Sequence, residues 1–208
     1  NIINYTDEHM FYLIKSIKDI LNILYKDNKL KYVQVFKNQG MNAGASQSHS
    51  HWQVLGLDIL PNKQKYMLNV LKQYEKEYCK CYFCNLDYSK NLVYENNEFI
   101  AFCPEDSLYC YEINIIPKKH ITNIRYLDNN MINQLGIILK KCLIKLNLAC
   151  NNVDYNICVY NGIREEYEYH FFIQIIPRVG NLAGFEFSTG MFVNSMLPED
   201  AAKNLRNL

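Results

Sequence analysis

The sequence has no excess of charge of either sign and no long apolar run. Its 22 basic and 21 acidic residues give a net charge of +1. A chain without a basic surplus lacks the field that attracts nucleic acid or an anionic membrane surface. No apolar stretch reaches the roughly 18 residues of a membrane-spanning helix, and the first residues lack the charged-then-apolar pattern of a signal peptide. We therefore expect a cytoplasmic protein with neither a nucleic-acid nor a membrane partner.

Disulfide bonds are also not expected, although the chain has eight cysteines. Stabilising disulfide bonds are typical of small secreted domains that cannot bury enough apolar surface. A chain of 208 residues with 49% hydrophobic residues can build its own core. Most of the cysteines stand among apolar residues, where a thiol behaves as a small hydrophobic group. Only Cys79, Cys81 and Cys84 cluster.

What the sequence does contain is an alternation of helical and strand patterns. Apolar residues at helical spacing predict helices, and short β-branched or aromatic runs between turn residues predict strands. The pattern favours an α+β fold with an antiparallel sheet. We expect helices over Thr6–Lys26, Pro61–Glu77, Asp128–Asn147 and from Pro198, and strands over Tyr32–Phe36, Leu92–Tyr94, Phe99–Phe102, Cys110–Ile116, Tyr155–Tyr160 and His170–Ile176.

One segment carries most of the chemistry. A loop of small residues, Gly44–Ser46, is followed by His49, His51 and Gln53 at every second position. If residues 49–54 form a strand, these three side chains project from one face and the side chains between them from the other. Small residues let the backbone approach a phosphate, and an imidazole is a nucleophile. The arrangement therefore predicts phosphate chemistry on one face of the strand and packing on the other.

The order of helix, strand, loop and histidine strand occurs twice, which indicates an internal repeat. The matching segments are Tyr32–Asn38 with Tyr155–Asn161, and His49–Gln53 with His170–Gln174. The second copy has Phe172 where the first has His51. Duplicated folds often keep the structure in both copies and the chemistry in one. We therefore predict that His51 is the catalyst and that His49 and His170 are structural.

The two copies are unequal in length. The second has strands and a Cys-x-x-Cys pair before its helix, whereas the first begins at its helix. We therefore expect the first repeat to be incomplete. We expect residues 1–60 to form the C-terminal half of the first repeat and residues 61–208 to form the second.

The second repeat contains the residues of a metal site. Cys81 and Cys84 have the spacing with which two thiolates bind one tetrahedral Zn²⁺, and His120 and His170 supply the two further ligands that such a site needs. A site closed by four protein ligands stabilises the fold and has no open position for chemistry. The alternative is reduced thiols that bind no metal. By the repeat, His49 is a ligand of an equivalent first site whose other ligands would precede Asn1.

These motifs resemble the galactose-1-phosphate uridylyltransferase branch of the histidine-triad superfamily, including its ADP-glucose phosphorylase-like members. The resemblance spans nearly the whole chain, and it implies duplicated histidine-triad-like repeats with helices packed on an antiparallel sheet. It also implies a homodimer whose active sites borrow residues across the interface. The matching segments are Phe36–Gly40, Gly44–Gln53, Cys81–Cys84, Ile116–His120, His170–Pro177, Ala183–Glu186, Thr189–Gly190 and Leu197–Ala202.

The resemblance also implies roles for individual residues. His51 matches the family's nucleophile, and Gln53 matches the glutamine that hydrogen-bonds the phosphoryl group in transfer. Asn38 and Ser46 match positions that contact the nucleotide phosphates, and Glu186 matches one that binds sugar hydroxyls. The first histidine of the motif, here His49, binds metal in the family.

The predicted function is therefore nucleotidyl transfer. His51 would take UMP or AMP from a nucleotide-sugar and pass it to a sugar 1-phosphate or to phosphate, while the backbone amides of Gly44, Ala45 and Ser46 stabilise the growing negative charge. Two alternatives stay open: a histidine-triad hydrolase or phosphorylase of nucleotides, and a non-catalytic relative that binds zinc and nucleotide. Trp52, a bulky residue beside the nucleophile, favours the latter. The sequence leaves the base, the sugar and the acceptor open.

Overall fold

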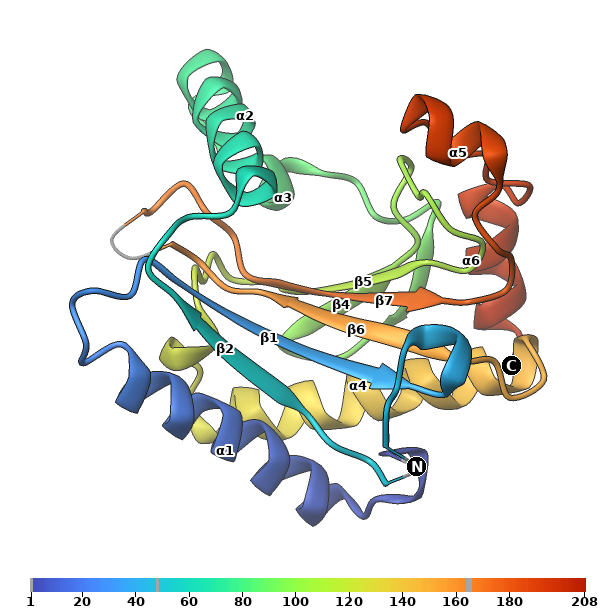
Figure 1. Cartoon of the computed structure of the whole chain (residues 1–208), viewed down its shortest axis with the longest axis horizontal. Coiled ribbons are helices and arrows are strands. Elements are labelled where there is room, and N and C mark those ends of the chain that lie inside the picture. The colour runs from blue at the N-terminus through green and yellow to red at the C-terminus, as the bar shows by residue number, and fades with distance from the viewer. Residues whose placement is uncertain (1, 48, 164–165) are drawn as a thin grey trace.

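A seven-stranded antiparallel sheet with the order β2-β1-β6-β7-β5-β4-β3 forms the centre of the computed structural model, which describes residues 2–47, 49–163 and 166–208 (Figure 1). The α+β fold expected from the sequence is confirmed. The strands are β1 Tyr32–Gln39, β2 Gln53–Leu57, β3 Leu92–Glu95, β4 Phe99–Phe102, β5 Ile113–Pro117, β6 Tyr155–Tyr160 and β7 Phe172–Pro177. The helices are α1 Asp7–Leu24, α2 Asn62–Tyr78, α3 Tyr82–Asn85, α4 Asn129–Ala149, α5 Gly184–Thr189 and α6 Pro198–Arg206, with 3-10 turns η1 Ile2–Asn4, η2 Met41–Ala43 and η3 Ile124–Tyr126.

Helices α1 and α4 cover one face of the sheet (Figure 1). Each begins at a side-chain cap that satisfies a free backbone N–H of the first turn, Thr6 for α1 and Asp128 for α4. Apolar side chains at helical spacing on both helices meet those of the strands in the main core. The two helices approach closely where Met10 lies over Gly136, since a Cβ atom on Gly136 would lie 3.0 Å from the Cβ of Met10.

The other face of the sheet is only partly covered. Helices α2 and α3 stand above it on one side and α5 on the other (Figure 1). A smaller apolar cluster lies beneath α2, where Leu68 and Leu71 pack with Tyr160 and Phe172 of the sheet. The rings of Tyr160 and Phe172 are stacked, with centroids 4.3 Å apart. This open face holds the cysteine pair at α3, whereas the histidine segment lies in the loop before the edge strand β2.

The internal repeat is visible in the sheet. The order α1, β1, β2 recurs as α4, β6, β7, and the two copies meet where β1 pairs antiparallel with β6, Val35 opposite Val159. β2 and β7 flank this central pair. On the far side of β7 the second copy continues through β5, β4 and β3, whereas β2 is an edge strand. The two copies therefore contribute two and five strands to one continuous sheet.

Several strand boundaries differ from the expectation, including the start of β7 at Phe172 instead of His170. β2 begins at Gln53, so His49 and His51 lie in the preceding loop: the β1–β2 ladder ends at the pair Phe36–Gln53, beyond which β1 pairs only with β6. β5 begins at Ile113 because Tyr111, at φ 59°, turns the chain just before it. The short helices α3 and α5 were not predicted. Among the described residues, no helix has the length and apolar character needed to cross a bilayer.

Candidate active site and metal centre

The loop after β1 is fixed by a carboxylate from the other repeat. The Asp154 carboxylate accepts a hydrogen bond from the backbone N–H of Asn42, 2.9 Å away. Gly40 has φ 86°, and a Cβ atom on it would lie only 1.7 Å from the Asp154 carboxylate oxygen. Glycine is therefore required at this position for two reasons, a left-handed backbone and the close approach of Asp154. The loop's path depends on this contact.

A chain of side chains connects the loop to the end of β7. Asn156 donates to the Asn38 side chain and to the carbonyl of Ala43, both at 2.8 Å. Arg178 in turn donates from Nε to the side-chain oxygen Oδ1 of Asn156 at 2.7 Å. Sequence reasoning missed Asp154, Asn156 and Arg178, because single polar residues at strand ends give no local signal of a long-range contact.

Within the loop, part of the expected anion-binding backbone is already used. The N–H of Gly44 donates to the carbonyl of Met41, and that of Ala45 donates to the carbonyl of Gly40. Among the described residues, Ser46 makes no hydrogen bond through its N–H or its hydroxyl, and its side chain is exposed. Of the three backbone amides predicted to stabilise charge, that of Ser46 is the one available to a ligand.

The two histidines of the motif lie beside each other. Their ring centroids are 5.4 Å apart, and Nδ1 of His51 lies 3.0 Å from the carbonyl oxygen of His49. A carbonyl only accepts, so Nδ1 of His51 carries the proton and Nε2 has a free lone pair. Gln53 opens β2 directly after them.

Trp52 faces away from this chemistry. It packs against the main core on the helix-covered face together with Val54, so the residues of the motif alternate between two faces as the sequence predicts. Beside it, the fully buried Lys37 donates from Nζ to the hydroxyl of Ser50 at 3.0 Å. Burial lowers the pKa of Lys37. Sequence reasoning missed this buried amine, since a lysine within a strand normally points to solvent.

The four predicted metal ligands do come together. The sulfur atoms of Cys81 and Cys84 and ring nitrogens of His120 and His170 all lie within 4.8 Å of one another. The distances from sulfur to Nδ1 are 3.4 Å for Cys81 to His170 and 3.6 Å for Cys84 to each histidine. Ligands of a tetrahedral Zn²⁺ are separated by about 3.3–3.8 Å, given metal–ligand bonds of about 2.0–2.3 Å. The cluster therefore has the dimensions of a metal site.

The outer nitrogens of both histidines fit the same interpretation. Nε2 of His120 lies 2.7 Å from the carbonyl oxygen of Tyr167, and Nε2 of His170 lies 3.2 Å from that of Pro117. Each Nε2 therefore carries a proton and donates a hydrogen bond to a carbonyl oxygen. This leaves Nδ1 unprotonated and directed at the cluster. This is the arrangement that orients histidine ligands in metal sites.

The pKa shifts within the cluster also fit a metal site. Burial, assisted by the nearby His120, lowers the pKa of His170 to about 4. Burial, assisted by the neighbouring Cys81, raises the pKa of the Cys84 thiol to about 12. Without a cation the pocket therefore favours a neutral imidazole and a neutral thiol. A bound divalent cation would supply the positive charge that a thiolate needs there.

Two other predicted residues lie apart from these groups. His49 is outside the cluster, and within the described ranges no second group of three possible metal ligands gathers around it. Glu186 lies on α5, where its carboxylate accepts from the N–H of Ala183 at 2.9 Å. In Figure 1, α5 stands above the open face of the sheet, whereas the loop that leads into β2 lies at the lower edge of the sheet, near the N-terminus. Among the described residues, no hydrogen bond joins Glu186 to His51.

Comparison with known proteins identifies the family. Residues 4–207 match a sequence family described as a domain of unknown function, DUF4921. A solved ADP-glucose phosphorylase from Arabidopsis thaliana, with bound ADP-glucose, is 32% identical and superposes with a TM-score of 0.95, covering 100% of this chain and 69% of that one. A galactose-1-phosphate uridylyltransferase from Thermotoga maritima is 24% identical, covering 99% of this chain and 72% of its own. The chain belongs to the galactose-1-phosphate uridylyltransferase family.

The chain spans only part of its relatives in the galactose-1-phosphate uridylyltransferase family. The curated ADP-glucose phosphorylase of Arabidopsis thaliana is 34% identical over 201 residues, which are 94% of this chain but 57% of that protein. The family membership predicted from the motifs is confirmed, and this member shares the family's fold.

Proposed function

We propose that the protein is a nucleotidyltransferase that moves UMP or AMP between a nucleotide-sugar and a sugar 1-phosphate or phosphate, through a covalent nucleotidyl-His51 intermediate. The observation that carries the proposal is the hydrogen bond from Nδ1 of His51 to the His49 carbonyl. It leaves Nε2 of His51 with a free lone pair that can act as a nucleophile. The named activities of the relatives support the same reaction class.

The proposed reaction has two displacements. In the first, the Nε2 lone pair of His51 attacks the α-phosphorus, a P–N bond forms, and the bond to the departing sugar phosphate breaks. In the second, an oxygen of phosphate or of a sugar 1-phosphate attacks the same phosphorus, and the P–N bond breaks. His51 returns to its starting state, and neither step requires a separate base because Nε2 attacks with a lone pair that is already free.

The surrounding polar groups fit the charge that develops on the phosphoryl oxygens. We assign this role to the N–H and hydroxyl of Ser46 and to the Gln53 amide. Asn38 would contact the nucleotide phosphates while Asn156 holds its side chain in place. Arg178, bound to the same Asn156, adds a cation to this side of the loop. Gly44 and Ala45 would shape the loop, because their N–H groups are already bonded within it.

We propose Zn²⁺ as the metal of the cysteine–histidine cluster. Two thiolates and two imidazoles are the donor set that Zn²⁺ accepts in structural sites. Cys81, Cys84, His120 and His170 would close its coordination, so the ion would tie α3 to the sheet and take no part in the transfer. His49 would bind a metal only with ligands from outside this chain. The free cysteines and such a site fit a reducing compartment, the cytoplasm.

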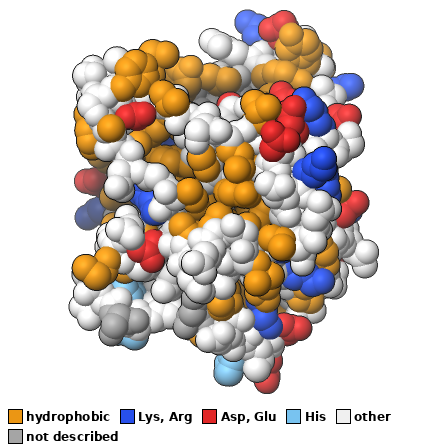
Figure 2. Space-filling view, turned by 90° about the vertical axis from the view of Figure 1, so that its right-hand side faces the viewer, with side chains coloured by type: hydrophobic (Ala, Val, Ile, Leu, Met, Phe, Trp, Pro, Cys, Tyr) orange, Lys and Arg blue, Asp and Glu red, His pale blue; other side chains and the backbone are white. Residues whose placement is uncertain are grey.

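We further propose a homodimer in which Glu186 binds the sugar hydroxyls in the partner's site. The segment around α5 exposes an unusual number of large apolar side chains, and Figure 2 shows hydrophobic groups spread over this side of the molecule. They include Leu182, Phe185, Phe187, Met191, Val193 and Leu197. Exposed apolar surface of this extent is typical of an interface.

Residues 1–60 and 61–208 would be the partial first repeat and the second repeat, respectively.

Intact-protein mass spectrometry tests the transfer directly. The protein is incubated with ADP-glucose or UDP-glucose and quenched at alkaline pH, where phosphohistidine survives. We expect a mass increase equal to AMP or UMP, lost in His51→Asn and retained in His9→Asn, which alters an exposed histidine at the start of α1. ADP-glucose is the first donor to try because the 34% identical relative is an ADP-glucose phosphorylase. The absence of an adduct with both donors would contradict the proposal.

A further inference from the structure

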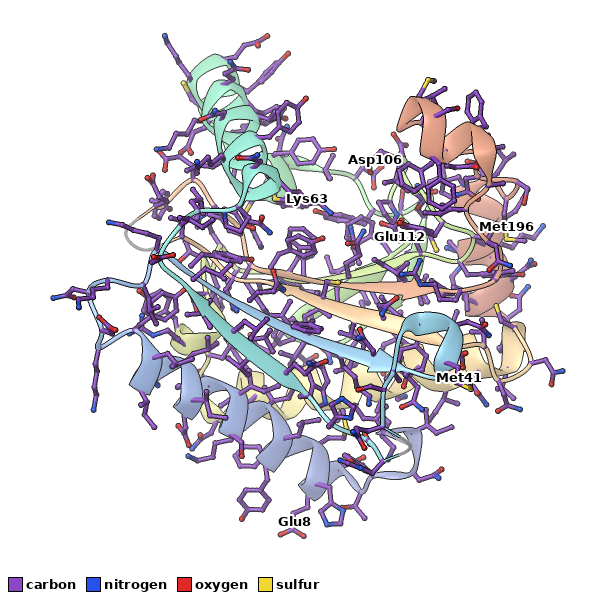
Figure 3. All side chains as sticks on the ribbon, in the orientation of Figure 1. Glu8, Met41, Lys63, Asp106, Glu112 and Met196 are labelled. Carbon is purple, nitrogen blue, oxygen red and sulfur yellow. The ribbon has the colours of Figure 1, made fainter. Side chains whose placement is uncertain are left out.

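A cavity of about 680 Å³ lies over the second repeat's half of the sheet. It is bounded by α2, α3 and the segment between β4 and β5, and its floor includes Asn114, Tyr160, Phe172 and Gln174. Figure 3 shows Lys63 near the start of α2 and Asp106 and Glu112 on the segment facing it, above the open face of the sheet. The cavity is thus separate from the loop that holds His51.

The cavity occupies the second repeat's counterpart of the histidine motif. Phe172 and Gln174 match His51 and Gln53 in the repeat. Phe172 stacks on Tyr160 and has no nucleophilic atom, and the Gln174 amide is used to bind the Glu112 carboxylate, 2.5 Å away. This half of the sheet therefore has a floor suited to binding but no group for transfer.

The walls of the cavity are aromatic. The rings that line it are those of Tyr66 and Tyr74 of α2, Tyr82 and Phe83 of α3, and Tyr88. Aromatic faces carry partial negative charge and attract cations, most strongly where water is excluded. A ligand with an apolar body would also bury surface against these rings.

The charges around the cavity are predominantly negative. Four carboxylates line it, those of Asp87, Glu105, Asp106 and Glu112, against the single cation Lys63. Lys63 donates to the Tyr160 hydroxyl at 2.7 Å, so its charge is directed at the floor. A phosphate or carboxylate ligand would be repelled here, whereas a cation would be attracted.

Two buried acceptors in the lining are without donors. The Oδ1 atoms of Asn91 and Asn114 have no hydrogen-bond partner among the described residues, although these side chains are only 6% and 8% exposed. A buried acceptor without a partner is costly, and a ligand or water that donates to it removes the cost. Both residues line the cavity. A complementary ligand is therefore rich in hydrogen-bond donors.

We propose that this cavity binds an organic amine, a cationic nitrogen carried on an aromatic or apolar body. The ring would lie among the tyrosines, and the ammonium N–H groups would face the carboxylates and the asparagine oxygens. This inference does not depend on the proposed function, because it uses no residue of the histidine loop.

A charge series on one carbon skeleton tests the proposal. Phenethylamine, 2-phenylethanol and phenylacetate share the ring and differ in charge. In calorimetric titrations of the zinc-loaded protein, we expect the amine to bind at least tenfold more tightly than the alcohol and the acid to bind more weakly than both. Equal affinity for amine and alcohol, or no binding of any of the three, would overturn the proposal.

Variants locate the binding. Glu105 and Asp106 are exposed at the cavity, so their replacement should leave the fold intact. We expect Glu105→Gln with Asp106→Asn to lower the amine affinity at least fivefold and to leave the alcohol affinity unchanged. Glu8→Gln with Asp19→Asn, which removes two exposed carboxylates on α1 beyond the other face of the sheet, is the matched control. An equal loss in the control would show that overall charge, not the cavity, attracts the amine.

Discussion

Lys37 is the most unusual residue near the histidine segment. Its side chain is fully buried on the helix-covered face, and its Nζ donates to the hydroxyl of Ser50, the residue between the two histidines. A buried amine is retained at a cost in stability, because a charge loses its hydration there. Its hydrogen bond to Ser50 joins β1 to the loop segment between the two histidines.

The burial of Lys37 predicts a pH dependence of stability. Its pKa is lowered in the folded state, so the unfolded chain holds the proton more tightly and the protein gains stability as the pH rises towards 10.5, the ordinary pKa. We expect the unfolding free energy of the wild type to rise relative to Lys37→Met between pH 7 and pH 10 in urea titrations. Lys29→Met, an exposed lysine, should show no such trend. A constant difference for Lys37→Met would contradict the assignment.

Gly40 allows a second residue-scale prediction. In Gly40→Ala the new Cβ would meet the Asp154 carboxylate, and the residue would hold a φ of 86° that alanine rarely adopts. We expect a loss of about 1–3 kcal/mol in unfolding free energy, measured in urea, together with a more than tenfold loss of nucleotidylation. Gly180→Ala, where a Cβ meets nothing within 4 Å, is the control. Normal labelling in Gly40→Ala would show that the loop does not depend on this contact.

At this scale the sequence predicted the residues with a local signature and missed those without one. The spacing of Cys81 and Cys84 and the alternation of His49, His51 and Gln53 are properties of neighbouring positions. Asp154 binds the backbone of Asn42, 112 positions away along the chain, and Arg178 reaches the loop only through the side chain of Asn156. No local pattern records such pairings.

Among the elements, α3 depends most on the proposed metal. It has a single turn, none of its residues is buried, and the metal ligands Cys81 and Cys84 stand at its start and within it. A turn with so little packing is not stable alone. Helix α3 also forms part of the wall of the cavity that we propose to bind an amine.

Metal removal is therefore expected to destabilise the protein locally and measurably. A chelator strong enough to remove Zn²⁺ should lower the Tm by roughly 5–15 °C, since a few kcal/mol correspond to shifts of that order in a chain of this size. Cys84→Ser should reproduce the shift, with one equivalent of zinc lost by elemental analysis. Cys79→Ser should not, because that exposed thiol lies outside the cluster. An unchanged Tm on full metal removal would contradict a structural role.

Long elements were predicted better than short ones. Helices α1, α2 and α4 carry several turns of amphipathic pattern, and their observed limits lie close to the expected ones. The short helix α5 has no buried residue, so no apolar spacing marks it. The histidine strand was predicted too long because the alternation of faces persists through the loop from Ser50 to Val54, although the ladder of hydrogen bonds does not.

At the scale of the whole molecule, the separation of Glu186 from His51 makes the proposed dimer testable. His51→Asn and Glu186→Gln are each expected to give inactive homodimers. Refolded together, they should recover on the order of a quarter of the wild-type activity, because half of the dimers are mixed and each contains one complete site. If Glu186 served its own chain, the mixture would stay inactive. Analytical ultracentrifugation of both variants checks that dimerisation itself is intact.

The support of the loop by Asp154, Asn156 and Arg178 has an evolutionary consequence. All three belong to the copy that lacks a nucleophile, yet two of them hold the loop that presents His51 and the third binds to one of these. Under the proposed reaction, selection therefore extends to residues of the second repeat that support the loop and carry no reacting group. Natural variants at these positions would be recognised as catalytic defects, although they change no atom of the reacting groups.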